Sequence, residues 1–278
     1  MKSANMFRLT FLSATSKTTT HRVVPFRMGR LLSGVAGYAA GGLDSSFISG
    51  IDKVSFPADT KTTLSATLTT GRQNAAGFAN SGTAGYAAGG HDGSAYISGI
   101  DKVSFPADSK TTLSATLTTA RNGMAGFANS GVAGYAAGGD GGATLSGIDK
   151  ITFPADTKTT LSATLTTARE QPAGFANSGT AGYAAGGLGP PVISGIDKIT
   201  FPADTKTTLS ATLTTARRLA MSFANSGVAG YVAGGSDSGG NISGIIKVAF
   251  PADTLTTLSA TLTTARFIGA GFADSGTL

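Results

Sequence analysis

The sequence predicts an all-β fold of the β-propeller class, built from repeated four-stranded units. A segment of 48 or 49 residues recurs along the chain, and a period of this length is typical of propeller blades. Gly is abundant, with 40 of 278 residues, which suits short strands joined by tight turns. No segment shows apolar residues at the three- and four-residue spacing of an amphipathic helix.

Four motifs define the repeat. The motif GY(A/V)AGG has its tyrosine at Tyr38, Tyr86, Tyr135, Tyr183 and Tyr231. The motif FPAD(T/S) begins at Phe56, Phe105, Phe153, Phe201 and Phe250. The motif TLTT(A/G)R ends at Arg72, Arg121, Arg169, Arg217 and Arg266. The motif F-A-(N/D)-S-G begins at Phe78, Phe127, Phe175, Phe223 and Phe272. Because the motifs keep one order, every unit is predicted to fold in the same way.

Each unit divides into four predicted strands, and the second copy serves as the example. The first, 76–80, ends at the turn N-S-G, whose Asn and Gly tolerate positive φ. The second, 84–90, closes with Gly-Gly, which marks a break or a close backbone approach. The third, 97–105, is rich in β-branched residues, and the P-A-D-S segment after it turns the chain. The Thr-rich segment 111–119 is the fourth strand, and four strands per unit match one propeller blade.

The unit resembles a kelch repeat. The resemblance rests on the Gly-Gly doublet after a short strand, the aspartate in the following strand and the arginine that closes the unit, and it covers nearly the whole chain. It implies a kelch-like β-propeller. Kelch units usually carry a tryptophan on the last strand and this chain has none, so leucines are expected in its place: Leu64, Leu113, Leu161, Leu209 and Leu258. The Thr/Ala/Gly-rich composition also resembles repeat proteins of bacteriophages and cyanobacteria.

Two parts are expected along the chain. Residues 1–22 form a basic N-terminal arm with a degenerate half-repeat, and residues 23–278 form the propeller repeats. The half-repeat, Phe7–Arg22, resembles the third and fourth strands of a unit, and a copy of the first strand remains at the C-terminus. Pairing these terminal strands in a sixth, split blade would cover two bare sheet edges. The alternatives are therefore six blades closed in this way, or five.

The net charge of +6 is concentrated in the arm. Residues 1–43 hold six basic residues and no acid, and subtracting six from 21 leaves 15 basic against 15 acidic residues in the remainder. A neutral body argues against a nucleic-acid partner. No apolar run approaches the ~18 residues of a membrane span. The Ser/Thr-rich arm is either a targeting segment or part of the propeller.

Differences between the copies collect in two loops. These are the loop between the second and third strands and the loop that follows the closing arginine, and in an up-and-down blade both open onto one face. Loops on a rigid scaffold carry recognition, although simple sequence drift is the alternative. The candidate ligand-binding residues are Asp44, Phe47, His91, Asp92, Tyr96, Asp140, Glu170, Pro190, Arg218, Asp237, Asn241 and Phe267.

Four of these acids follow Gly-Gly, namely Asp44, Asp92, Asp140 and Asp237. A calcium ion is one interpretation, and stabilisation of a Gly-rich turn is the favoured one. The closing arginines form a second recurrent set, matched by Asp52, Asp101, Asp149 and Asp197. Opposite charges that recur once per blade are expected to pair and form a structural ring. The fifth unit has Ile246 at the aspartate position, which predicts that Arg266 is left without a carboxylate.

Catalytic chemistry has few candidate residues. Cys is absent, and His21 and His91 are the two histidines, so thiolate and multi-histidine metal sites are not expected. Glu170 is the single glutamate, and no phosphate-binding or dinucleotide-binding motif occurs. We therefore expect no enzymatic activity, no cofactor and no metal.

The resulting functional hypothesis is a recognition module that binds a glycan or protein receptor through the variable loops of one propeller face, as in a phage virion or tail-associated protein. The alternative is a purely structural virion or assembly subunit, docked to its partner by the basic arm. Both hypotheses place the protein in a virion or outside the cell.

Overall fold

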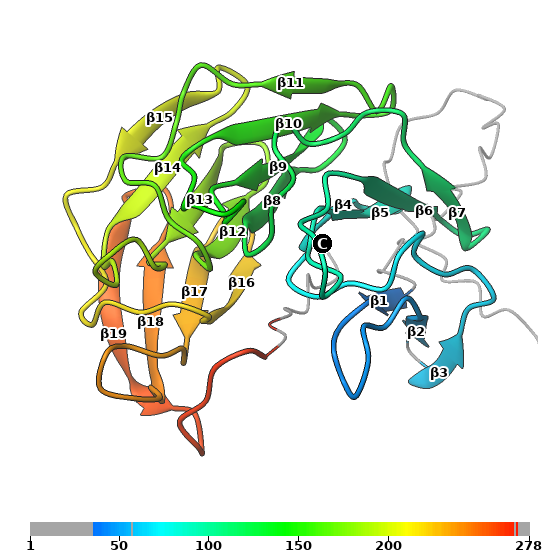
Figure 1. Cartoon of the computed structure of the whole chain (residues 1–278). Helices are drawn as coiled ribbons and strands as arrows, with labels where there is room; N and C mark the ends of the chain where they lie inside the picture. The colour runs from blue at the N-terminus through cyan, green and yellow to red at the C-terminus, as the bar shows by residue number, and fades with distance from the viewer. Residues whose placement is uncertain (1–35, 57, 270, 272–278) are drawn as a thin grey trace, which may run out of the picture. The chain divides into compact units, whose positions relative to one another are not determined.

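The computed structural model describes residues 36–56, 58–269 and 271, and within them the chain is all-β. Five antiparallel sheets follow one another in sequence order and form a β-propeller (Figure 1). The predicted fold class is therefore confirmed, with five sheets in agreement with one of the two expected blade numbers. The basic arm and the half-repeat lie outside the described residues, as do the strands expected to form a split sixth blade, apart from residue 271.

Each sheet is an up-and-down meander. The first comprises β1 (Ala36–Ala40), β2 (Ile51–Ser55) and β3 (Thr60–Thr63). The second comprises β4 (Ala76–Asn80), β5 (Ala84–Ala88), β6 (Ile100–Ser104) and β7 (Ser109–Thr112). The third comprises β8 (Ala125–Asn129), β9 (Ala133–Ala137), β10 (Ile148–Thr152) and β11 (Lys158–Thr160). The fourth comprises β12 (Ala173–Asn177), β13 (Ala181–Ala185), β14 (Ile196–Thr200) and β15 (Thr205–Thr208). The fifth comprises β16 (Met221–Asn225), β17 (Ala229–Ala233), β18 (Gly244–Ala249) and β19 (Thr254–Thr261).

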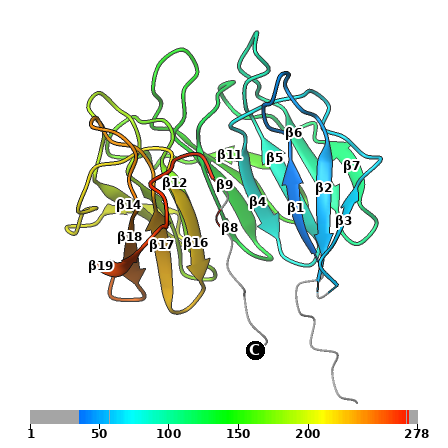
Figure 2. The same cartoon turned by 90° about the horizontal axis from the view of Figure 1, so that it is seen from below.

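The first strand of each complete sheet is the innermost one. Strands β4, β8, β12 and β16 contact one another in succession, and Figure 2 shows successive sheets standing side by side. Small residues allow this approach: a Cβ atom added to Gly126 would lie 2.4 Å from the carbonyl oxygen of Gly77. The glycines of β8 and β12 thus allow close packing against the preceding sheet, whereas β16 has Ser222 at this position, and its hydroxyl donates to the Gly174 carbonyl at 2.8 Å.

Aromatic rings fill the space between neighbouring sheets. Phe78 stacks on Tyr86 at 5.3 Å within the second sheet, and Tyr86 stacks on Phe153 of the third sheet at 5.0 Å between centroids. The Phe78 ring lies over Gly134, where an added Cβ would be 2.0 Å from the ring. Stacked rings of this kind contribute beyond their buried area. The same arrangement recurs at the following two junctions.

The outermost strand is shorter than the sequence predicts. In the second sheet it spans β7, and the chain then leaves the sheet rather than continuing to 119. The chain contacts the sheet again at Leu117, whose N–H donates to the Ser98 carbonyl. The Leu117 side chain is only 3% exposed. The fully buried leucines are Leu68, Leu117, Leu165 and Leu213. The leucines expected in the tryptophan position, among them Leu113, are partly buried against the core.

Candidate functional site

The two variable loops meet at one edge of the sheets. Gln73, which follows the closing arginine of the first unit, exchanges two backbone hydrogen bonds of 3.0 Å with His91 of the second unit. His91 in turn forms a β-bridge with Tyr96 on the far side of its own loop. The same double bridge recurs at the next three junctions. The loops that differ between copies therefore form one continuous edge, as the sequence predicts.

We call this edge the variable rim and define it by three positions per unit. The position after the closing arginine is held by Gln73, Asn122, Glu170, Arg218 and Phe267. The position after Gly-Gly is held by Leu43, His91, Asp140, Leu188 and Ser236. The position before the third strand is held by Phe47, Tyr96, Thr144, Val192 and Asn241. No two copies carry the same triplet.

Rim residues are held by backbone groups, whereas the constant turns are held by side chains. At the N-S-G turns, Ser130 Oγ accepts from the Ser81 N–H at 3.1 Å, and Asn129 Oδ1 accepts from the Gly179 N–H at 2.9 Å. These bonds link one sheet to the next, so replacing Ser or Asn breaks an inter-sheet contact. A backbone bridge such as the one between Gln73 and His91 places no demand on the side chain. The rim can therefore change its side chains without loss of the scaffold.

Aromatic residues gather on the rim of the first two sheets. The Phe47 and His91 rings lie 6.3 Å apart, and the His91 and Tyr96 rings meet edge to face at 5.1 Å. Phe47 also packs on the backbone of the adjoining loop, because a Cβ on Gly93 would lie 2.3 Å from its ring. The Tyr96 hydroxyl donates to Asp140 of the third sheet at 2.5 Å. These contacts brace the loops across sheet boundaries and pre-organise the surface.

The carboxyl group of Glu170 has a raised pKa. Burial raises the pKa of its carboxyl group above the usual value, the nearby Asp140 raises it further, and Arg218 acts in the opposite direction. The hydrogen bond to Asp140 is the main cause of a raised pKa at Tyr96. This sector of the rim thus combines aromatic faces with a carboxylate pair and a guanidinium group.

The acids that follow Gly-Gly stabilise their own turns. Asp92 accepts from the N–H groups of Ser94 and Ala95, and Asp237 accepts from those of Gly239 and Gly240. Asp140 does the same for Gly142. In the part of the chain that the structure describes, no three His, Asp or Glu side chains gather into a metal-binding group. The favoured turn interpretation of these acids is confirmed for these three loops.

The remaining candidates lie apart from this cluster. Asp44, Pro190 and Asn241 are exposed, and Phe267 is 42% exposed. The structure joins none of these four side chains to another by a hydrogen bond within the described ranges. They lie in the variable loops of the first, fourth and fifth units.

The arginine and aspartate rings pair between units rather than within them. Arg72 of the first unit donates to Asp101 of the second at 2.5 Å, with both side chains no more than 2% exposed. The next two junctions repeat this pair with Arg121–Asp149 and Arg169–Asp197. Ile246 therefore removes the carboxylate partner of Arg217, which donates to the carbonyls of Gly234 and Gly244 instead. The prediction that Ile246 deprives Arg266 of its partner is wrong, although Arg266 also has no ion pair among the described residues. The error arises because equal spacing does not reveal which unit supplies the partner.

A second inter-sheet site was missed at the level of sequence. The FPAD(T/S) aspartates adopt positive φ, for example 53° at Asp108, which points the carboxylate back at the preceding sheet. Asp108 accepts from the Tyr38 hydroxyl at 2.6 Å and from Lys53 at 2.7 Å. Burial and this hydrogen bond raise the pKa of the Tyr38 phenol. The signal in the sequence is the constant spacing of tyrosine, lysine and aspartate between units. It was overlooked because a role in the turn was enough to account for the aspartate.

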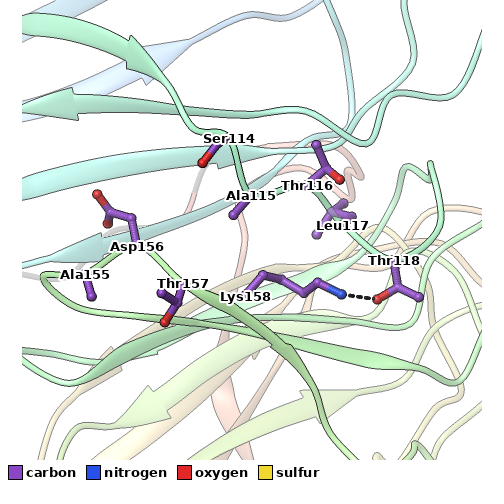
Figure 3. Close-up of a pocket in the computed structure, with 9 residues that line it drawn as sticks. All are labelled: Ser114, Ala115, Thr116, Leu117, Thr118, Ala155, Asp156, Thr157 and Lys158. Atoms are coloured by element: carbon purple, nitrogen blue, oxygen red, sulfur yellow. Dashed lines mark hydrogen bonds between the residues drawn. The ribbon is translucent and has the colours of Figure 1, made fainter.

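A hollow of about 620 Å³ lies between the second and third sheets, at their outer segments (Figure 3). It is lined by Ser114–Thr118 and Ala155–Lys158, which are residues that the other units repeat nearly unchanged. Lys158 Nζ donates to Thr118 Oγ1 at 2.7 Å inside it. Because its residues are repeated nearly unchanged in the other units, we assign this hollow to blade packing.

No protein-family model matches the sequence, and no curated protein matches it. The structure shows a β-propeller of repeated sheets, and the kelch and bacteriophage resemblances rest on the sequence motifs and composition. No helix within the described ranges is long and apolar enough to cross a membrane.

Proposed function

We propose that the protein is a non-enzymatic recognition module that binds a glycan or protein receptor through the variable rim. The observation that carries the proposal is that different groups hold the two edges of the sheets in place. One edge is fixed by Ser and Asn side chains, and the other is fixed by backbone bridges that leave the side chains at the three rim positions of each unit free to differ. A surface of this kind suits a binding protein whose specificity changes while its fold does not.

The aromatic sector is the part of the rim best suited to a ligand. Phe47, His91 and Tyr96 offer ring faces and edges, and Asp140 and Glu170 offer acceptors for hydroxyl or amide donors. Binding sites commonly combine apolar faces with a few fixed polar groups. A virion or tail-associated location accords with the resemblance to bacteriophage repeat proteins and is part of the proposal.

The test is a binding screen of the purified full chain against a glycan array and intact bacterial cells, cyanobacterial cells included. The matched variant carries Phe47→Thr and Tyr96→Thr, because the third unit already has Thr144 at this position. The control variant carries Thr62→Ala on the exposed outermost strand of the first sheet. We expect the double variant to lose at least about tenfold in affinity, or about 1.4 kcal/mol, with the control unchanged.

Binding that survives in the double variant would place the ligand elsewhere on the protein. An absence of binding by every form would favour the alternative role, a structural virion or assembly subunit. In that case, deletion of residues 1–22 should abolish co-assembly with the partner while the propeller stays folded.

A further inference from the structure

The junctions between sheets share one polar contact. At each of the four junctions from the first sheet to the fifth, a tyrosine hydroxyl and a lysine ammonium of one sheet donate to the FPAD(T/S) aspartate of the next. At the last of them, Tyr183 donates to Asp253 at 2.7 Å and Lys198 donates at 2.6 Å. The phenylalanine of the same turn, Phe250, stacks on Tyr183 at 5.3 Å. The acceptor of these bonds always comes from the following unit.

The fifth sheet presents the donor half of this contact without its acceptor. Tyr231 and Lys247 lie opposite each other in the register of β17 and β18, as Tyr183 and Lys198 do in β13 and β14. Among the described residues, neither side chain has a hydrogen bond or ion pair, and the ring stack of Phe223 and Tyr231 has no third ring. The fifth sheet is at one end of the series (Figure 1), so this face has no neighbouring sheet in sequence order.

The chain beyond the fifth sheet begins another unit in the expected place. The Ile268 N–H donates to the Leu219 carbonyl at 3.1 Å, just as the Leu219 N–H donates to Gln171 one unit earlier. Gly271 packs on the backbone of Ser222, where an added Cβ would lie 2.4 Å from the carbonyl oxygen. Residues 268, 269 and 271 therefore follow the same path along β16 that starts each innermost strand.

We propose that the face formed by Phe223, Tyr231 and Lys247 is a docking surface for the third and fourth strands of a repeat unit that carries the FPAD(T/S) turn. The phenylalanine of its FPAD(T/S) turn stacks on Tyr231. The aspartate of that turn, in the same positive-φ conformation as Asp253, accepts from Tyr231 Oη and Lys247 Nζ. The partner is thereby defined by chemistry: an aromatic ring followed three residues later by a carboxylate held in a tight turn.

The test adds such a unit to the chain and measures the reactivity of the Lys247 amine. A copy of residues 84–121 is fused after Thr277, and lysine acylation is followed by mass spectrometry at each site. The hydrogen bond from Lys53 to Asp108 raises the pKa of that ammonium group, so Lys53 serves as the internal reference for a docked lysine. Only the neutral amine reacts, and each unit of pKa lowers its population about tenfold. We expect Lys247 to react faster than Lys53 in the original chain and to slow to the level of Lys53 in the fusion.

The matched control is the same fusion with its counterpart of Asp108 changed to alanine, in which Lys247 should react fast again. Equal protection in the two fusions, or none in either, would overturn the proposal. Protection of Lys247 already present in the original chain would also overturn it. If that protection depends on protein concentration, a second copy covers the face. If it does not, another part of the same chain covers it, either the first sheet or the half-repeat of residues 7–22. Each result is independent of rim binding, which is measured with the rim variants.

Discussion

The buried pair of Arg121 and Asp149 allows a direct measurement of what the inter-unit ring contributes to stability. Asp149 accepts from Arg121 at 2.9 Å, from the Thr118 N–H at 2.9 Å and hydroxyl at 2.7 Å, and from the Thr160 hydroxyl at 2.9 Å. The Arg121 and Asp149 side chains are 3% and 1% exposed. The substitution Asp149→Ala leaves the guanidinium group buried without its counter-charge.

Removing one partner of a buried ion pair costs about 3–5 kcal/mol. At about 2–4 °C per kcal/mol for a chain of this size, Tm should fall by roughly 6–20 °C. The matched control is Asp52→Ala in the first sheet, where the carboxylate is 46% exposed and pairs with Lys61 at 3.1 Å. Water screens an exposed ion pair, so the control should barely shift the transition.

Urea unfolding of both variants, followed by circular dichroism, gives the free energy of unfolding and the slope of the transition, and thermal unfolding gives Tm. Equal losses in the two variants would refute the reasoning that burial, rather than the ion pair itself, sets the cost. A loss below about 1 kcal/mol for Asp149→Ala would show that backbone carbonyl acceptors alone satisfy the arginine. Arg217 provides a natural precedent, because it is buried with only carbonyl partners.

Three further outcomes are expected. Gly134→Ala should destabilise by more than about 1 kcal/mol because its Cβ would overlap a neighbouring ring, whereas Gly77→Ala, with open space around it, should be neutral in thermal unfolding. Ile246→Asp gives Arg217 the carboxylate that its sister arginines have, so the loss should stay under about 2 kcal/mol, and complete unfolding would contradict this. Burial raises the pKa of Glu170, so its ionisation in the folded state costs stability as pH rises through the unfolded-state value toward that raised pKa. Glu170→Gln should therefore stabilise at pH 7 and not below the unfolded-state value of about 4.3, as read from Tm at both pH values.

The sequence by itself determined the repeat, the all-β class and the order of strands within a unit. These follow from local physics: Gly-Gly and N-S-G permit positive φ, Pro fixes a turn and β-branched runs favour strands. It also located the variable loops on one edge, because an antiparallel meander places alternate loops at the same end. The sequence also predicted that Asp92 and Asp237 stabilise their own turns.

Only the tertiary structure decided which unit supplies each partner. Asp101 binds Arg72 of the preceding unit, and Asp108 binds Tyr38 and Lys53 in the same direction. A perfect repeat places an identical residue in every unit. Spacing along the chain therefore cannot distinguish a partner in the same unit from one in the neighbouring unit. That choice depends on how one sheet packs on the next, and packing is set by contacts distant in sequence.

The variable rim shows the same division. Sequence comparison between the copies revealed that Gln73 and His91 belong to positions that differ, yet could not separate recognition from drift. The backbone bridge between these two residues supplies the physical reason that such positions are free to differ, while Ser130 and Asn129 are fixed by the hydrogen bonds of their side chains. Side-chain freedom at a position is a property of the contacts around it, and those contacts exist only once the sheets are assembled.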